Sequence, residues 1–204
     1  MEVSSELSVE SFSLFIGALK FGARRHSFQK RKDKGGTPYF NHPIEVAETL
    51  WSVGAVREMH ILTAALLHDV IEDTQTRPDE VEALFGSVIL SIVQEVSDDK
   101  GLPKGTRKAL QIEHAPHLST KGKLIKLADK ICNIRDVIHS PPSDWPVERR
   151  IEYLDWAEQV VRGLEGCNAK LEQEFYRILQ EGRQALCGGR TTKEEPGGCR
   201  QDLE

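Results

Sequence analysis

AALLHDVIEDT, residues 64–74, is the stretch that decides the fold of this chain. Its aliphatic residues, together with Ile61 and Leu62 just before it, surround the full circumference of an α-helix of about 3.6 residues per turn. A helix without a solvated face must be covered by other elements on every side. We therefore predict a buried central helix from about Val56 to Thr74.

Four ionisable residues interrupt this apolar segment: His68 and Asp69, then Glu72 and Asp73 about one turn later. Burying even an uncharged polar group without a partner costs roughly 2 to 7 kcal/mol, and burying a charge costs more. A metal cation is the simplest group that would compensate such a cluster. The alternative is a helix end at which the acidic residues reach water, and an isolated His-Asp dipeptide favours that alternative.

The composition predicts one domain followed by a tail. With 204 residues the chain can bury one core, and no internal linker divides it, so we predict a single domain over residues 1–186. Residues 187–204, CGGRTTKEEPGGCRQDLE, combine glycine, proline and charge with almost nothing apolar to bury. This composition predicts a disordered tail.

Charge and hydropathy exclude several classes of function. The formal net charge of −5 argues against broad binding to nucleic acid. No apolar run approaches the roughly 20 residues that cross a bilayer, and the acidic start, MEVSSELSVE, is unlike a signal peptide. The four cysteines lie far apart and form no CxxC pair, which suits a reducing compartment. We expect a cytoplasmic protein that does not bind membranes.

Helical periodicity recurs along the whole chain, and no segment of useful length alternates with the two-residue period of a strand. The predicted fold class is therefore all-α. The predicted helices span about 8–27, 44–53, 56–74, 77–86, 87–96, 106–114, 120–138, 147–164 and 168–186.

A basic loop separates the first two predicted helices. Residues 29–38, QKRKDKGGTP, cannot continue a helix through two glycines and a proline, so we expect a mobile, positively charged loop. Such a loop is usually solvated surface. The functional alternative is phosphate binding, in which backbone N–H groups and the side chains of Arg31 and Lys32 donate to phosphate oxygens.

The predicted helix 120–138 carries polar residues opposite its apolar stripe. Asp129, Asn133 and Asp136 lie on this side, about one turn apart. Periodicity alone predicts that they face solvent. The functional alternative is that this side of the helix faces an open active-site cavity.

His42 stands at the start of the second predicted helix, where Asn41 can cap the helix. A lone histidine at such a position is more often a packing residue than a ligand. Together with His68, Asp69 and Asp129, however, it completes a set of two imidazoles and two carboxylates. That set suits a divalent transition metal that keeps positions for water, and helices of one bundle can bring four such side chains together.

Four segments of the chain resemble one known family when their order and spacing are taken together. They are QKRK (29–32), PYFNHP (38–43), ALLHDVIEDT (65–74) and KLADK (126–130) with Asn133. These segments resemble the HD-domain metal-dependent phosphohydrolases, and within them the alarmone hydrolases related to bacterial SpoT and Rel. The resemblance covers about residues 11–179 and is strongest to the short animal members, which consist of the hydrolase domain alone. It implies an HD-domain bundle of about eight to ten helices.

The resemblance also implies roles for individual residues. His42, His68, Asp69 and Asp129 look like the ligands of one manganese ion per chain. Glu72 and Asp73 look like the pair that orients and deprotonates the attacking water. The positions expected to hold the phosphates or the nucleoside of the substrate are Arg31, Lys32, Lys104, Asn133 and Tyr153.

The implied activity is that of a manganese-dependent guanosine-3′,5′-bis(diphosphate) 3′-pyrophosphohydrolase, in which water activated by the metal releases pyrophosphate from the ribose 3′ position of (p)ppGpp. Residue chemistry supports a hydrolase independently, because a metal with N₂O₂ ligands acidifies water and Glu72 lies near enough to take the proton. One alternative is hydrolysis of the 2′-phosphate of NADPH at the same site. Another is a non-catalytic nucleotide sensor, although a sensor has no use for Glu72 and Asp73. The expected partner is a small nucleotide, and the oligomeric state stays open.

Overall fold

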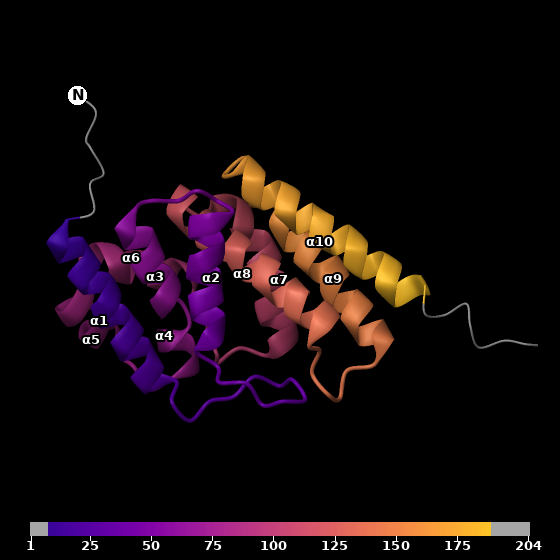
Figure 1. The fold of residues 1–204 in the computed structure, drawn as a ribbon, viewed down its shortest axis with the longest axis horizontal. Coiled ribbons are helices and arrows are strands. Elements are labelled where there is room, and N and C mark those ends of the chain that lie inside the picture. The colour runs from indigo at the N-terminus through magenta and orange to yellow at the C-terminus, as the bar shows by residue number, and fades with distance from the viewer. Residues whose placement is uncertain (1–7, 189–204) are drawn as a thin grey trace, which may run out of the picture.

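The structure, a computed structural model, describes residues 8–188. Within that range the chain forms ten α-helices, one short 3₁₀ helix and two isolated β-bridges but no strand, which confirms the predicted all-α class (Figure 1). The elements are α1 (Val9–Arg25), α2 (Asn41–Ser52), α3 (Met59–Leu67), α4 (Val70–Asp73), α5 (Pro78–Phe85), α6 (Ser87–Val96), α7 (Lys104–His114), η1 (Ala115–His117), α8 (Thr120–His139), α9 (Val147–Arg162) and α10 (Ala169–Gly188).

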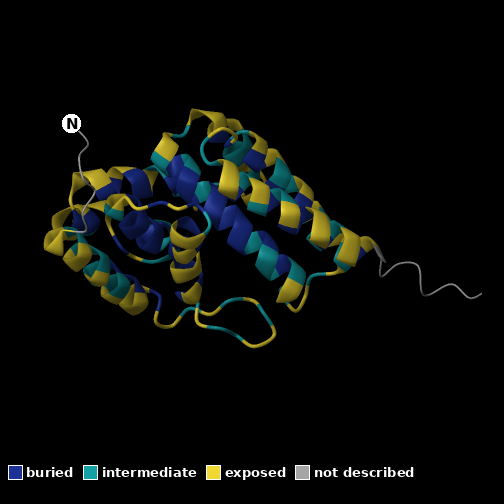
Figure 2. Cartoon of the chain, turned by 45° about the horizontal axis from the view of Figure 1, so that its top comes forward, coloured by how far each residue is buried: buried dark blue, intermediate teal, exposed yellow. Residues whose placement is uncertain are grey.

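Two helices, α3 and α8, form the centre of the fold. Every residue of α3 from Ile61 to Leu67 is buried, as the apolar circumference of this segment predicts. Helix α3 packs against α1, α2 and α6, and α8 packs against α2, α6, α9 and α10. Much of α8 is accordingly dark blue in Figure 2, because other helices cover it on more than one side.

The prediction of one continuous helix from Val56 to Thr74 was wrong. Helix α3 ends at Leu67, and α4 starts only at Val70. The cause is local: the His68 ring donates through Nδ1 to the carbonyl oxygen of Ala65 at 2.7 Å, and that carbonyl would otherwise accept from the N–H of Asp69. Asp69 takes φ −100° and ψ −4°, so the His-Asp pair forms a turn between two helices.

The predicted N-cap at Asn41 was also wrong. Asn41 is the first residue of α2, the N-cap position belongs to Phe40, and no side chain caps the helix. A turn makes a cap unnecessary, because the N–H groups of Asn41 and His42 already donate to the carbonyls of Pro38 and Tyr39, at 3.2 and 3.0 Å.

The basic loop predicted over residues 29–38 is present, and hydrogen bonds close it. The N–H of Arg31 donates to the carbonyl of Thr37 at 2.8 Å, and Gly36 supplies the positive φ of +61° that the turn between them needs. At its far side the N–H of Ser143 donates to the carbonyl of Lys32 at 3.2 Å. The loop is thereby tied to the segment between α8 and α9.

Helix α1 packs closely on the residue that precedes α2. A methyl group added at Gly22 would lie 2.2 Å from Cε2 of the Phe40 ring, whereas one added at Gly17 would meet Phe85 at an ordinary 3.7 Å. We predict that Gly22→Ala destabilises the fold by about 1 to 3 kcal/mol through overpacking. Gly17→Ala, on the same helix, should be neutral or stabilising by up to about 1 kcal/mol. Urea denaturation of both variants checks this, and equal stability of the two would contradict the packing described.

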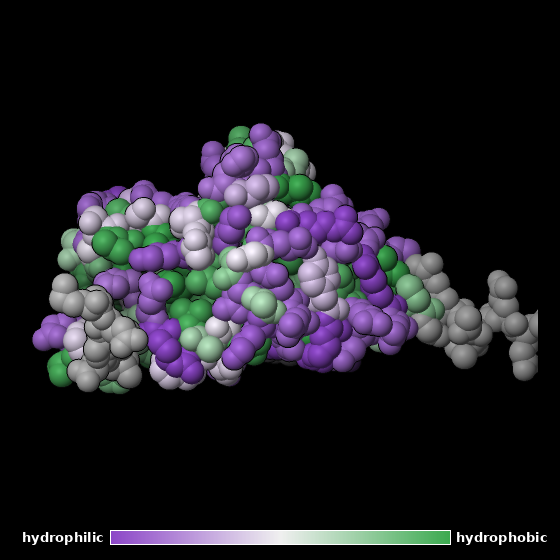
Figure 3. Space-filling view, turned by 90° about the horizontal axis from the view of Figure 1, so that it is seen from above, coloured by the Kyte–Doolittle hydropathy of each residue, from purple (hydrophilic) through white to green (hydrophobic). Residues whose placement is uncertain are grey.

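Two further predictions concern the C-terminal boundary of the domain and the absence of a membrane-spanning helix. Helix α10 runs to Gly188, two residues past the predicted boundary at 186, and the rest of the predicted tail lies outside the described residues. Between Ser8 and Gly188 the structure contains no helix with the length and apolar composition needed to cross a membrane. Figure 3 shows hydrophilic residues over much of one face, with apolar residues in patches between them.

Candidate active site

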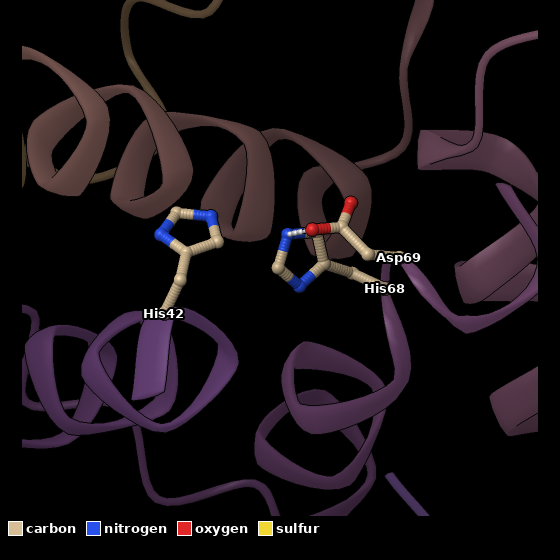
Figure 4. A group of neighbouring side chains, drawn as sticks. All are labelled: His42, His68 and Asp69. Carbon is tan, nitrogen blue, oxygen red and sulfur yellow. Dashed lines mark ion pairs between the residues drawn. The ribbon is translucent and has the colours of Figure 1, made fainter. Parts of the chain in front are cut away.

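Three separate parts of the fold bring the four predicted metal ligands together. His42 comes from the first turn of α2, His68 and Asp69 from the turn between α3 and α4, and Asp129 from the middle of α8. Figure 4 shows His42 reaching from its helix toward the His68 ring and the Asp69 carboxylate. Donor atoms of these three residues lie within 4.8 Å of one another. The carboxylate of Asp129 completes the cluster, with Oδ1 at 3.0 Å from Nε2 of His42 and 3.8 Å from Nε2 of His68.

The donor set fits a divalent cation. His42, His68 and Asp129 are buried, with exposed fractions of 2%, 5% and 7%. Because Nδ1 of His68 donates to a backbone carbonyl, Nε2 is the ring nitrogen that faces the cluster. That Nε2 atom is buried and has no hydrogen-bond partner. This buried imidazole nitrogen lies 3.2 Å from Oδ2 of Asp69 and 3.8 Å from Oδ1 of Asp129, an arrangement that a metal ion would satisfy.

The electrostatics of the cluster keep its carboxylates ionised. Burial disfavours charge on Asp69, but the nearby His68 and His42 rings outweigh it and hold the pKa of Asp69 well below its usual range. Burial likewise opposes charge on His68, yet Asp69 and Asp129 raise the pKa of that ring to about 9. For Asp129, Lys130 and His42 overcome burial and lower the pKa of the carboxyl.

Glu72, one of the two predicted catalytic residues, lies on α4 beside a group of cations. Its Oε2 accepts from the N–H of Asp98 at 2.9 Å, and its Oε1 lies 3.6 Å from Arg107 and 3.8 Å from Lys100. Burial, together with the negative charges of Asp69 and its other acidic neighbours, raises the pKa of Glu72 to about 6. A carboxylate with that pKa is suited to accept a proton near neutral pH.

Asp73, the other predicted catalytic residue, is connected to the metal ligands through a tyrosine. The hydroxyl of Tyr39 lies 2.6 Å from Oδ2 of Asp69 and 2.7 Å from Oδ2 of Asp73. One hydroxyl proton thus serves two carboxylates, and burial and these two charges raise the pKa of Tyr39. Asp73 also forms an ion pair with Lys100.

A cavity of about 350 Å³ opens beside the cluster and receives most of the predicted substrate-binding residues. Arg31, Lys32, Asn133 and Tyr153 line it, together with His42. Lys104 is not among its lining residues. The ammonium group of Lys104 instead lies 5.9 Å from the ring of Trp145, which does line the cavity.

The polar side of α8 faces this cavity rather than open solvent. Asp129 is 7% exposed, while Asn133 and Asp136 are half-buried and line the cavity. The solvent-facing alternative for these residues was therefore wrong. Periodicity could not reveal this, because it depends on the packing of α2 and α9 over α8.

Sequence reasoning missed several residues that the structure places at the site. Lys130 is buried, and its ammonium group lies 2.8 Å from Oδ2 of Asp129 and 4.9 Å from the ring of Trp156. Lys130 belongs to the KLADK segment, and its position next to a proposed ligand was the one available signal. The other missed residues are Tyr39, Lys100 and Arg107.

Comparisons with known proteins show which family this chain is similar to. The family model described as HD domain matches residues 18–154. The chain is 45% identical to guanosine-3′,5′-bis(diphosphate) 3′-pyrophosphohydrolase MESH1 of Danio rerio, over 86% of this chain and 97% of that protein. Identity to the Homo sapiens protein of the same description is 49%, over 81% of this chain and 93% of that protein.

A solved structure described as a metazoan ortholog of SpoT that hydrolyses ppGpp and plays a role in starvation responses is similar throughout. Its TM-score is 0.81 and its identity 45%, and the match covers 83% of this chain and 95% of that one. A second solved structure, lmo0812 from Listeria monocytogenes, matches with a TM-score of 0.58 and 27% identity, over 72% of this chain and 98% of that one. From its motifs, its fold and these matches, the chain belongs to the HD domain family.

Proposed function

We propose that this chain is a manganese-dependent hydrolase that removes pyrophosphate from the ribose 3′ position of (p)ppGpp. The observation that carries the proposal is a His₂Asp₂ cluster beside a cavity lined by basic side chains, with the carboxylate of Glu72 on the short helix that directly follows Asp69. Relatives named for this activity match nearly their whole length to this chain. The cysteines within the described chain are free thiols, which supports a cytoplasmic site of action.

His42, His68, Asp69 and Asp129 would hold one divalent ion, and we take manganese as that ion. When bound, such an ion supplies Lewis acidity, which makes water more acidic and neutralises charge on a phosphoryl oxygen. Lys130 is not a ligand itself but orients Asp129, because its contact with Oδ2 of Asp129 leaves Oδ1 directed toward the two histidines.

The protein's own groups handle the proton and the orientation of the attack. Glu72 accepts the proton of the attacking water, and its pKa of about 6 leaves it largely ionised at pH 7. Its hydrogen bond from the N–H of Asp98 fixes one oxygen and leaves the other for water. Asp73 and Tyr39 hold the Asp69 side of the site in a fixed orientation.

The cavity supplies the contacts to the substrate. Arg31 and Lys32 present cationic donors to the phosphate oxygens, whose negative charge needs compensation while water attacks phosphorus and the bond to the ribose 3′ oxygen, the leaving group, breaks. Asn133 and Tyr153 line the same cavity and would hold a phosphate group or the nucleoside. A volume of about 350 Å³ is within the range of small-ligand sites.

Turnover by metal-stripped protein reloaded with individual metals tests this function. The panel contains (p)ppGpp, NADPH and simple phosphomonoesters. We expect manganese to restore release of pyrophosphate from (p)ppGpp with the highest kcat/KM. Preferential release of phosphate from NADPH would assign the same site to that cofactor instead, and binding of (p)ppGpp without turnover under any metal would make the chain a sensor.

Replacing Arg31 and Lys32 together with alanine should lower kcat/KM for (p)ppGpp by roughly 10²- to 10⁴-fold, since each charge-assisted contact contributes about 1.5 to 3 kcal/mol, or roughly ten- to a hundredfold. The loss should be much smaller for p-nitrophenyl phosphate, which places no second phosphate near these side chains. Steady-state kinetics on both substrates measure this. Lys34→Ala, in the same loop but outside the cavity lining, is the matched control. Equal losses on both substrates would mean that the loop does not clamp a polyphosphate.

A further inference from the structure

Arg31 is held in place by two residues of α8. Its Nη2 atom forms an ion pair with Asp136 and donates to Oδ1 of Asn133 at 3.3 Å. The amide of Asn133 in turn donates to Oδ1 of Asp129 at 2.6 Å. Asp129, Asn133 and Asp136 are spaced about one turn apart on α8. One face of this helix therefore contacts both the cluster of proposed metal ligands and the guanidinium of Arg31.

This contact uses only one end of the guanidinium. An arginine side chain has five N–H donors in a rigid plane, and within the described chain the side-chain hydrogen bonds of Arg31 all come from Nη2. The ring of Tyr39 lies 5.7 Å from the guanidinium carbon and limits its tilt. The Nε and Nη1 donors are therefore available to an anion in the cavity that Arg31 lines.

We infer that Asp136 is a positioning residue for substrate binding: it fixes the plane of Arg31 so that the free edge of the guanidinium receives a phosphate group. This inference rests on the proposed function. Its energetic basis is that Arg31 and Asp136 are only 19% and 32% exposed, so the pair is less screened than a surface ion pair. An arginine already held in one rotamer loses less conformational freedom when the substrate binds.

A different role for Asp136 would be to hold a cation. Donor atoms of His42, Glu45 and Asp136 lie within 4.8 Å of one another, which is close enough for a shared ion. One contact argues against it, because Asp136 is already paired with Arg31. His42 does not decide the question, since its Nε2 faces Asp129 whereas its buried Nδ1 has no hydrogen-bond partner among the described residues. Binding of a cation by Asp136 is therefore kept as an alternative outcome of the experiment described next.

The test compares Asp136→Ala with Asp136→Asn, which keeps an oxygen that can accept from Nη2. With manganese and (p)ppGpp, we expect Asp136→Ala to raise KM about tenfold while kcat stays within about twofold, and Asp136→Asn to recover part of the loss. In a double-mutant cycle, the KM of the Arg31→Ala/Asp136→Ala variant should be no higher than that of Arg31→Ala alone, because Asp136 acts through Arg31. Asp155→Asn, which breaks an exposed pair with Arg183 on α10, should change nothing.

Binding of inorganic pyrophosphate to the metal-stripped proteins, measured by calorimetry, separates this inference from the proposed function. If (p)ppGpp is not hydrolysed by the wild type, the function fails, whereas weaker pyrophosphate binding by Asp136→Ala still supports the positioning role. Tighter pyrophosphate binding would overturn it, because Asp136 would then compete with the anion for Arg31. The inference would also be overturned if the effects of Arg31→Ala and Asp136→Ala on KM multiplied in the double variant. Loss of manganese from Asp136→Asn would overturn it as well.

Discussion

Asp69→Ala is expected to lose both its bound manganese and its turnover. The variant removes one of two carboxylates from a buried cluster and leaves His68 without its partner at 3.2 Å. Water is a poor replacement for a buried anionic ligand. The affinity for manganese should fall at least about 10³-fold, beyond the roughly 10- to 100-fold typical of a residue that only supports a ligand.

Elemental analysis after dialysis, together with (p)ppGpp turnover, measures this result. Asp79→Asn is a suitable control, because Asp79, in the first turn of α5, is an exposed carboxylate whose one ion pair within residues 8–188 is with Arg77. Full manganese occupancy in Asp69→Ala would remove Asp69 from the proposed ligand set.

Glu72→Gln is expected to keep its manganese and to lose at least about 10²-fold in kcat, the usual scale for loss of a general base. Glutamine has the same size, and its amide oxygen can still accept from the N–H of Asp98. It cannot take a proton from water. The same change also removes the negative charge that lies 3.6 Å from Arg107, so structural integrity needs a check by thermal denaturation.

Metal content and kcat measured on one preparation decide between the two roles of Glu72. Glu181→Gln, which removes an exposed partner of Arg177 on α10, serves as the matched control. Metal loss in Glu72→Gln would make Glu72 a ligand, and a kcat near that of the wild type would mean that another group takes the proton.

The fold could be predicted where apolar periodicity and helix-stop residues agree. The bounds predicted for α6, 87–96, are those observed, because Gly86 precedes an unbroken apolar stripe. The break after Leu67 could not be predicted, since no glycine or proline marks it. It arises because the ring of His68 takes the carbonyl of Ala65.

The residues of the candidate site could likewise be predicted only in part. Residue type and spacing sufficed to name His42, His68, Asp69 and Asp129, which the structure brings together. Their partners could not be named, because a contact such as that of Tyr39 with Asp69 joins residues 30 positions apart and depends on the packing of whole helices. The burial of Lys130 is equally a property of the assembled bundle.

The separation of the proposed ligands along the chain has a thermodynamic consequence. His42 and Asp129 are 87 residues apart, and they come together only when α2 packs on α8. An ion held by both therefore acts as a reversible cross-link that the unfolded chain cannot form. At a free-ion concentration about 100 times Kd, binding to the native state alone would add about 2.7 kcal/mol to the free energy of unfolding. A bound ion would then contribute to the stability of the native fold as well as to the chemistry of the site.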